Sequence, residues 1–314
     1  MFVKKYQNED SIIWNEFVSL AKNSHFFFLR KYMDYHSSRF IDHSLMIYDD
    51  KNSLIALLPA NISGNQLISH QGLTFGGLLI KASAKQNEIL SVFKALQDYL
   101  SANKLTSLTY KRMPYIYHEM PCDEDLYALF RVNAKLIRRD VSSTIKLEKQ
   151  IKYSKGRKWI VKKASESGMI YQESTDINSF WSNLTAVLQR VHGVNPVHTV
   201  DEIKYLHETF PKNIKFYTAT LNNEEVSGAV IFEVGNTVHT QYLFNSELGR
   251  QVGALDGLID YLVKNTYADR AYFDFGISNE DQGRVLNEGL ISQKEGFGAR
   301  AVVHDFYEIY PGCE

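Results

Sequence analysis

The chain has 314 residues, of which 44% are apolar and 23% charged, so it is long enough to bury the cores of two globular domains. Its 35 basic and 36 acidic side chains give a formal net charge of −1, so no overall field draws the chain to nucleic acid or to an anionic membrane. Only six prolines occur, which excludes a Pro-rich disordered protein.

The sequence shows no pattern of secretion or membrane insertion. Met1 to Asn8 lacks the apolar stretch of a secretion signal, and no segment approaches the roughly 20 apolar residues of a membrane helix. Cys122 and Cys313 lie far apart and would pair only if the fold brought them together. The sequence therefore favours two unpaired thiols in a cytoplasmic protein without a membrane span.

Hydrophobic periodicity predicts alternating helices and strands in the first half of the chain. A strand near residues 2–6 precedes an amphipathic helix on which Trp14, Phe17, Val18 and Ala21 recur at helical spacing. A short helix, three strands, a helix, a strand, a helix and a strand follow over residues 29–36, 44–48, 53–62, 66–80, 84–103, 105–110, 123–132 and 134–147.

The second half repeats this order. Asp176 and the capping box formed by Thr199 and Glu202 begin two helices, which Gly193 and Pro211 end. Three strands, a helix, a strand, a helix and a strand follow over residues 214–221, 226–234, 237–245, 253–264, 270–276, 280–293 and 301–310.

The repeated order of elements indicates two similar units. Strands that alternate with helices after an antiparallel meander are typical of mixed α/β sheets. The sequence therefore predicts an α/β protein with one domain over residues 1–150, a second over residues 151–314 and a cleft between them. A further helix over residues 154–167 is expected to link the two units.

Short motifs occur along this order, mostly in the second half of the chain. They are Lys162-Lys163-Ala164, Ser167-Gly168, His239-Thr240-Gln241-Tyr242, Gly253-Ala254-Leu255-Asp256, Phe273-Asp274-Phe275-Gly276 and Lys294-Glu295-Gly296-Phe297-Gly298, with Leu58-Pro59-Ala60-Asn61 and Gly72-Leu73-Thr74-Phe75-Gly76-Gly77 in the first half. Together they resemble the GNAT acyltransferase fold present twice, as in the Fem-type transferases and the FemAB-like or BioF2-like acetyltransferases. The likeness covers nearly the whole chain.

The resemblance implies a tandem GNAT fold and an N-acyltransferase. Such an enzyme would move an acyl group from acyl-CoA, for instance acetyl-CoA, to an amine of a small molecule, a sugar nucleotide or a cell-envelope precursor. A Fem-type aminoacyl transferase that uses aminoacyl-tRNA is the alternative, which the lack of a long helical-hairpin insertion disfavours. A non-catalytic binding module on the same fold is a third interpretation.

Donor binding is expected where a strand turns into a helix at residues 249–255. In GNAT enzymes the backbone amides of this turn hold the pyrophosphate, since a helix N-terminus presents unpaired N–H groups. Arg250 and Gly253 match the pattern, and Gln251 and Ala254 lie beside them, whereas Leu255 replaces the last small residue. A glycine that merely lets the chain turn explains Gly253 equally well.

Three residues are candidates for catalysis. By resemblance, Lys294 stabilises negative charge on the carbonyl oxygen, although a lysine near a helix C-terminus also interacts favourably with the helix dipole. His239 can accept a proton from an amine near neutral pH. Asp274, on the next strand, could do the same or orient the amine, and a structural hydrogen bond is the alternative for either residue.

Other residues are candidates for binding the acceptor. Strict alternation along the strand places His239 and Gln241 on one face and Tyr242 on the other. The loop that joins two helices at residues 191–198 borders the cleft in this family type. The resemblance therefore makes His192, Asn195 and His198 candidates for contacts with the acceptor. A tight connection explains the loop equally well, and the spacing of its histidines does not match a zinc site, so no metal is expected.

Two further features could bind an anion. Arg30 and Tyr32 could bind an anionic acceptor, or they could simply lie on an exposed helix face. From Lys135 to Lys163 there are eleven Lys or Arg side chains and two acidic ones. This segment could guide a polyanion such as a nucleotide sugar, CoA or tRNA, or it could be a solvated helix and linker.

Overall fold

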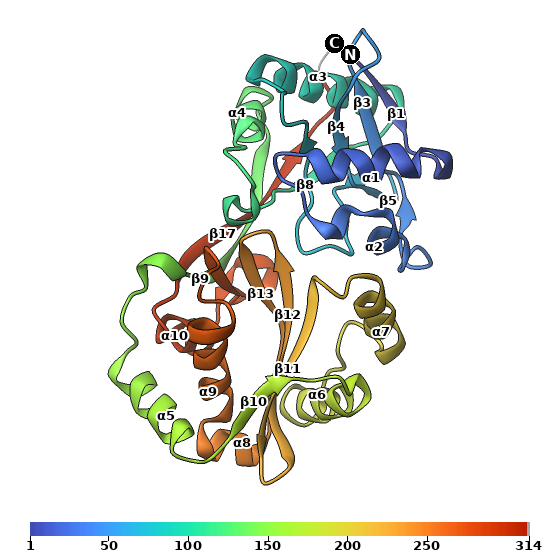
Figure 1. Ribbon diagram of the computed structural model, residues 1–314. Helices are drawn as coiled ribbons and strands as arrows, with labels where there is room; N and C mark the ends of the chain where they lie inside the picture. The colour runs from blue at the N-terminus through green and yellow to red at the C-terminus, as the bar shows by residue number, and fades with distance from the viewer. Residues whose placement is uncertain (313–314) are drawn as a thin grey trace. The chain divides into compact units, whose positions relative to one another are not determined.

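The computed structural model describes residues 1–312, which form two compact units (Figure 1). Unit 1 comprises Met1–Asp140, Asp281–Val285 and 303–312, and unit 2 comprises Val141–Glu280 and Leu286–Val302. The division is not a single cut near residue 150, because strands β9 (Lys135–Lys146) and β17 (Arg300–Ile309) each begin in one unit and end in the other.

Unit 1 contains two sheets. One has the strand order β1-β3-β4-β7 and the other the order β17-β8-β6-β5-β2. The strands are β1 (Phe2–Lys5), β2 (Ile41–Asp42), β3 (Leu45–Tyr48), β4 (Leu54–Leu58), β5 (Asn61–Ser63), β6 (Gln66–Ile68), β7 (Leu79–Ile80) and β8 (Ser107–Lys111). The single strand predicted over residues 53–62 is wrong, because Pro59 lacks the N–H that would continue the ladder and the chain changes sheet there.

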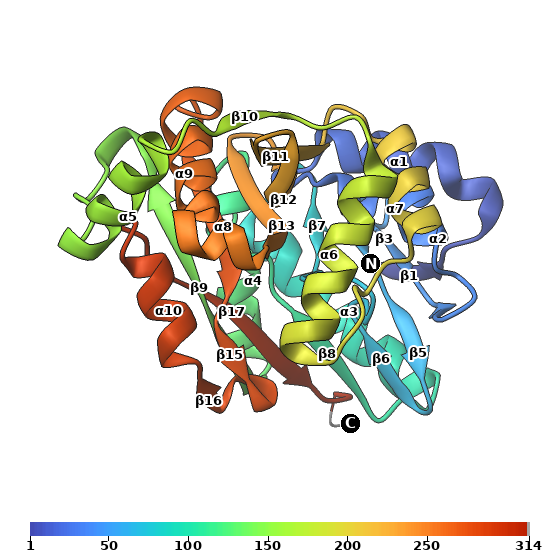
Figure 2. The same ribbon diagram turned by 90° about the horizontal axis from the view of Figure 1, so that it is seen from below.

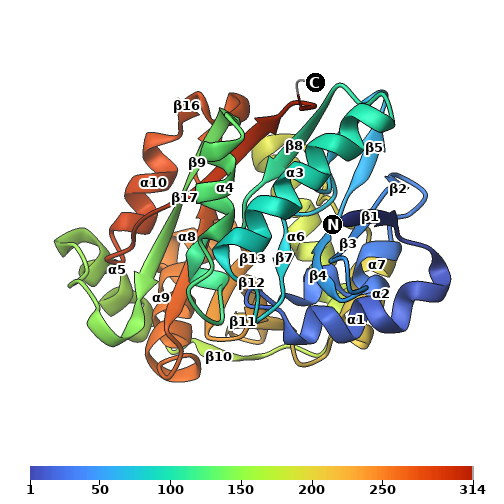
Figure 3. The same cartoon turned by 90° about the horizontal axis from the view of Figure 1, so that it is seen from above.

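Four helices pack against these sheets. They are α1 (Ser11–Leu20), α2 (Arg30–Asp34), α3 (Gln86–Ala102) and α4 (Glu124–Arg131). Helix α3 buries Ile89, Phe93, Leu96 and Leu100 in the core of unit 1, as its sequence periodicity predicts. Figure 3 shows α3 and α4 side by side over the strands of this unit.

Unit 2 is built on strands in the order β10-β11-β12-β13-β14-β9. They are β10 (Ile170–Glu173), β11 (Ile214–Leu221), β12 (Glu224–Val234), β13 (Thr237–Asn245), β14 (Tyr272–Ile277) and the last part of β9. Neighbours pair antiparallel except β13 and β14, which run parallel. The sequence prediction missed β10, whose residues are mostly exposed and show no apolar alternation.

Helices cover both faces of the unit 2 strands. They are α5 (Lys155–Ser165), α6 (Ile177–His192), α7 (Val200–Thr209), α8 (Glu247–Val252), α9 (Ala254–Tyr261) and α10 (Glu288–Glu295). Helices α6 and α7 lie on one side of β11 to β13, whereas α9 lies on the other with α5 outside it (Figures 1 and 2). Buried residues of β12, β13, β14 and α9 form the core of this unit.

One predicted helix is wrong. Residues 280–293 do not form a single helix, because two short strands, β15 (Asn279–Glu280) and β16 (Val285–Leu286), precede α10. Asp281, Gln282 and Gly283 between them all adopt positive φ angles, which a right-handed helix does not allow. Among residues 1–312, no helix combines the length and the apolar character needed to cross a bilayer.

Candidate active site

The structure brings His239 of β13 and Asp274 of β14 together inside unit 2. The two residues stand opposite each other in the parallel pair of strands, and Nδ1 of His239 lies 2.8 Å from Oδ2 of Asp274. The Asp274 carboxylate is completely buried, and its Oδ1 accepts hydrogen bonds from the hydroxyls of Ser142 and Thr144 on β9. A buried carboxylate needs such donors, so β9 stabilises the charge that faces the imidazole.

This contact determines what the imidazole can do. A carboxylate that accepts from Nδ1 holds the proton on that nitrogen, which leaves the lone pair of the neutral ring on Nε2. The His239 side chain keeps 12% of its surface exposed, whereas Asp274 has none. The arrangement can therefore take a proton at Nε2 and stabilise the resulting positive charge through Asp274.

Gly276, at the end of β14, leaves room next to the imidazole. Its φ angle of +74° lies in the left-handed region that favours glycine, and a methyl group at this position would lie 3.2 Å from Cε1 of His239. A larger residue here would crowd the imidazole edge. The glycine therefore contributes both the turn of the backbone and the space beside the ring.

Lys294 of α10 is buried and holds the end of β14. Its Nζ donates to the carbonyl oxygens of Gly276 (2.8 Å) and Ile277 (2.7 Å) and to Oγ of Ser278 (2.9 Å). An ammonium group has three N–H donors, so the chain itself uses all three. Burial lowers the pKa of Lys294 to about 8, against the opposing effect of the Asp274 charge. The structure thus gives Lys294 a positioning contact with the backbone that follows Asp274.

A β-bulge interrupts β13 at Gln241. Tyr242 stands opposite Val230 and Thr240 opposite Ile231, so Gln241 has no residue opposite it in β12. The strict alternation of faces predicted from His239 to Tyr242 is therefore wrong. Among the described residues, Oε1 of Gln241 is buried and lacks a hydrogen-bond partner, which is unfavourable unless a ligand donates to it.

His198 and Tyr242 form a second polar contact in unit 2. Nδ1 of His198 lies 2.6 Å from the Tyr242 hydroxyl, and the tyrosine ring packs edge-on against Trp181. Burial raises the pKa of Tyr242. Two of the predicted acceptor contacts, one from the 191–198 loop and one from β13, are thereby brought together.

Of the other two predicted residues of that loop, the structure describes the side chain of Asn195. Asn195 is exposed, and its Oδ1 accepts a 2.6 Å hydrogen bond from Gln189 of α6. The side chain of His192 lies outside the part of the chain that the structure describes.

The turn predicted to bind the donor is filled by packing within unit 2. Gly253 separates α8 from α9 with a φ of +77°, and a methyl group there would lie 2.6 Å from Cγ2 of Ile160 on α5. Ala254 is completely buried, whereas Arg250 and Gln251 are exposed. The glycine is explained by the left-handed turn and the close approach of α5.

The charge at this turn also disfavours an anion. Asp256 lies in the first turn of α9 and forms an ion pair with Arg157 of α5. A pyrophosphate at this helix start would meet the carboxylate, and the packed Ile160 blocks the approach to Gly253. The residues present therefore do not fit the pyrophosphate of CoA at the first turn of α9.

Several solved structures have the same combination of helices and strands. FemX matches with a TM-score of 0.67 over 99% of this chain and 97% of its own, at 10% identity. L-PGS from Bacillus licheniformis matches at 0.63, over 98% and 92%, at 13% identity. A tandem GNAT protein from the clavulanic acid biosynthesis pathway matches at 0.52, over 99% of both chains, at 10% identity. The chain has the tandem GNAT fold of FemX.

No protein-family model and no curated protein matches the sequence. The tandem GNAT fold predicted from the order of elements and the short motifs is confirmed by the solved structures. At identities of 10% to 13%, these structures show the fold alone.

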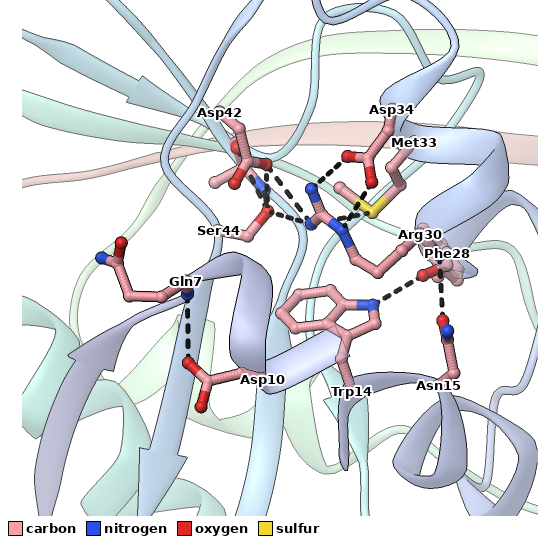
Figure 4. Close-up of polar contacts among 11 residues, drawn as sticks. Gln7, Asp10, Trp14, Asn15, Phe28, Arg30, Met33, Asp34, Asp42 and Ser44 are labelled. Atoms are coloured by element: carbon pink, nitrogen blue, oxygen red, sulfur yellow. Dashed lines mark hydrogen bonds and ion pairs between the residues drawn. The ribbon is translucent and has the colours of Figure 1, made fainter. Parts of the chain in front are cut away.

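In unit 1 of this tandem GNAT fold, Arg30 belongs to an internal network. Its guanidinium bonds to the carboxylates of Asp34 and Asp42 (Figure 4). The same group lies 3.9 Å above the ring centre of Tyr6. Only 5% of Arg30 is exposed, and Tyr32 is buried against Phe27. Charge pairing and stacking inside the unit account for both residues.

Metal binding and a thiol nucleophile would each need a particular arrangement of side chains in the described part of this tandem GNAT fold. Among residues 1–312, no three His, Cys, Asp or Glu side chains are arranged to hold a metal ion. Cys122 is buried and unpaired, and burial raises its pKa to about 12, which makes it a poor nucleophile at neutral pH. Cys313 lies outside the described residues.

Proposed function

We propose that the chain is an acyltransferase that transfers an acyl group from an activated donor to an amine, with the chemistry at His239 in unit 2. The observation that carries this proposal is the buried Asp274 carboxylate, held by Ser142 and Thr144 and bonded to Nδ1 of His239. A buried carboxylate paired with a partly exposed imidazole is an arrangement suited to general base catalysis.

The proton transfers of the proposed reaction can be assigned to this pair. The amine loses its proton to Nε2 of His239 as its nitrogen bonds to the acyl carbon, and Asp274 stabilises the imidazolium that forms. The bond from the acyl carbon to the leaving atom of the donor then breaks, and the leaving atom takes the proton back from Nε2. Gln241, whose buried Oε1 accepts no hydrogen bond from the described residues, can accept one from the incoming amine.

Lys294 keeps the strand end in place during these steps. It bridges the carbonyl oxygens of Gly276 and Ile277, which follow Asp274 by two and three residues. Because its three donors are used, we assign it a positioning role, and its positive charge beside the site adds favourable electrostatics for a developing oxyanion.

The acceptor amine is proposed to belong to a sugar, a sugar nucleotide or a cell-envelope precursor. This proposal rests on the tandem GNAT fold and its likeness to FemX. His198 and Tyr242 are candidates for contacts with the acceptor, since they form a polar pair on the same strand as His239 or packed against it.

Two molecules are candidates for the acyl donor. Both are cytoplasmic, in line with the predicted location of the chain. Acyl-CoA is the donor that the resemblance to GNAT acyltransferases implies, and the tandem GNAT fold supports it. Aminoacyl-tRNA is favoured by the misfit at α9, where Ile160 packs against Gly253 and Asp256 lies in the first turn of the helix. An aminoacyl ester brings no pyrophosphate to that turn.

Direct binding tests separate the two donors. Acetyl-CoA is expected to raise the melting temperature of the purified chain if CoA is the donor, and bulk tRNA is expected to co-purify with the chain if an aminoacyl ester is. Transfer from the bound donor to a panel of amino sugars, followed by mass spectrometry, then tests catalysis. Failure to bind either donor would contradict the proposal and leave a binding module on the same fold.

The pH profile tests the role of Lys294. Below about pH 8 the ammonium keeps three donors for its three acceptors, whereas the neutral amine above this pH has only two. We therefore expect kcat/KM to fall as the pH rises through about 8. Lys294→Arg, which stays charged, is expected to remove this limb of the profile even if its overall rate is lower. An unchanged alkaline limb in this variant would contradict the assignment.

A further inference from the structure

Helix α5 carries a cationic face, on which Lys162 lies 3.7 Å from the exposed Glu166 at the end of the helix. The fifteen residues from Lys149 to Lys163 contain seven Lys or Arg and no Asp or Glu, in a chain whose net charge is −1. Lys155, Lys158, Lys162 and Lys163 are all exposed; the first three lie three or four residues apart along the helix, and Lys163 directly follows Lys162. Their spacing places them on a single side of α5.

Trp159 stands in the middle of this face. Its side chain is 64% exposed, and Nζ of Lys163 lies 5.5 Å from the centre of its rings. The other two tryptophans, Trp14 and Trp181, are buried. A large aromatic group left in water among lysines is unfavourable for the isolated chain, and this points to a partner that covers it.

The opposite side of α5 is committed to unit 2. Ile160 packs against Gly253, and Ala164 is completely buried beside Gly257 of α9. Arg157 pairs with Asp256 and lies 4.5 Å above the ring of Phe297. Figures 1 and 2 show α5 outside α9 in this unit, so the lysine face points away from the core.

We propose that the α5 face, formed by Lys155, Lys158, Trp159, Lys162 and Lys163, docks on the surface of an anionic phospholipid membrane. Clusters of lysines on a helix are attracted to anionic headgroups, and tryptophan prefers the interface between headgroups and acyl chains. Together, the four lysines supply charge complementarity and Trp159 supplies a single interfacial anchor.

The choice of side chains favours a lipid surface over RNA. The exposed face has four lysines and no arginine, and the one arginine of α5 is used inside the unit by Asp256. Arginine is the residue of choice for phosphates of nucleic acid, because its planar fork binds them in two places, whereas lysine acts as a point charge. Single strands also tend to stack on several aromatic rings, and α5 offers one.

This inference does not depend on the proposed acyl transfer. The α5 face shares no residue with the His239 site, and lipid binding can be measured without a donor or an acceptor. A failure to bind vesicles would leave the proposed reaction intact, and an inactive protein could still bind vesicles.

The test is co-sedimentation of the full chain with phospholipid vesicles. We expect binding to vesicles that contain about one third phosphatidylglycerol, little binding to pure phosphatidylcholine, and weaker binding as salt rises. Replacing Lys155, Lys158, Lys162 and Lys163 by Gln is expected to lower the partition coefficient at least about tenfold. A matched control changes four exposed lysines elsewhere, Lys31, Lys51, Lys104 and Lys212, to Gln and is expected to bind within about twofold of the unchanged chain.

Tryptophan fluorescence gives a second readout. Because Trp14 and Trp181 are already buried, a blue shift on adding anionic vesicles would come from Trp159, and Trp159→Phe is expected to abolish it. The proposal is overturned if the chain does not bind anionic vesicles, or if the four-lysine α5 variant binds as well as the control. Binding of tRNA that the α5 variant loses, without any vesicle binding, would assign the face to RNA.

Discussion

Asp274→Asn is expected to lower kcat about 100- to 10,000-fold with the donor that the binding tests identify, while the protein remains folded. The amide keeps the size of the carboxylate, and its oxygen can still accept from Ser142 and Thr144. Its NH₂ group would then face Nδ1 of His239 and donate to it. The imidazole would carry its proton on Nε2, the nitrogen that must accept the proton of the amine.

The tautomer of His239 can be measured without any substrate. Nitrogen-15 chemical shifts of the imidazole are expected to show the proton on Nδ1 in the unchanged chain and on Nε2 in Asp274→Asn. Thr144→Val is the matched control, because it removes one of the donors to Oδ1 and leaves the contact with His239 in place. If Asp274→Asn kept both the tautomer and the rate, His239 would not be the base.

Gly253→Ala is expected to lower the free energy of unfolding by about 2–4 kcal/mol, because a left-handed backbone and a steric clash add together. Gly193→Ala is the matched control. Gly193 also has a left-handed φ, +66°, but its Cβ would meet nothing within 4 Å. The free energy of unfolding of this variant should therefore fall by only about 1 kcal/mol, the cost of the left-handed backbone conformation.

Urea denaturation with an Ile160→Ala partner separates the two contributions at Gly253. A methyl group at Gly253 would lie 2.6 Å from Cγ2 of Ile160, so shortening Ile160 should recover part of the loss as a coupling energy. Equal losses at Gly253 and Gly193 would mean that α5 moves aside easily. In that case the first turn of α9 could open for a phosphate group after all.

Local signals in the sequence predicted much of the fold of unit 2. The capping box of Thr199 and Glu202 begins α7 in the structure, and Asp176 and Gly193 cap the two ends of α6. These features depend on neighbouring residues alone. The prediction of a helix over residues 280–293 was wrong because the polar sequence there fits a helix as well as a turn. The positive φ angles in this segment come from tertiary structure.

The candidate site was only partly accessible from sequence. Alternation along two strands singled out His239 and Asp274, but the 2.8 Å contact between them requires the parallel pairing of β13 and β14. The donors from Ser142 and Thr144 come from a strand more than a hundred residues earlier and gave no sequence signal. The burial of Arg30 among Asp34, Asp42 and Tyr6 likewise follows from long-range packing.

The path of β9 has a practical consequence for dissecting the protein. A fragment that starts at residue 151 would contain His239, Asp274 and Lys294 but would lack Ser142 and Thr144. Its buried acid would lose two hydroxyl donors, and β14 would become a bare sheet edge. A fragment used to study unit 2 must therefore start before Ser142. The inactivity of a shorter fragment would say nothing about the activity of the intact protein.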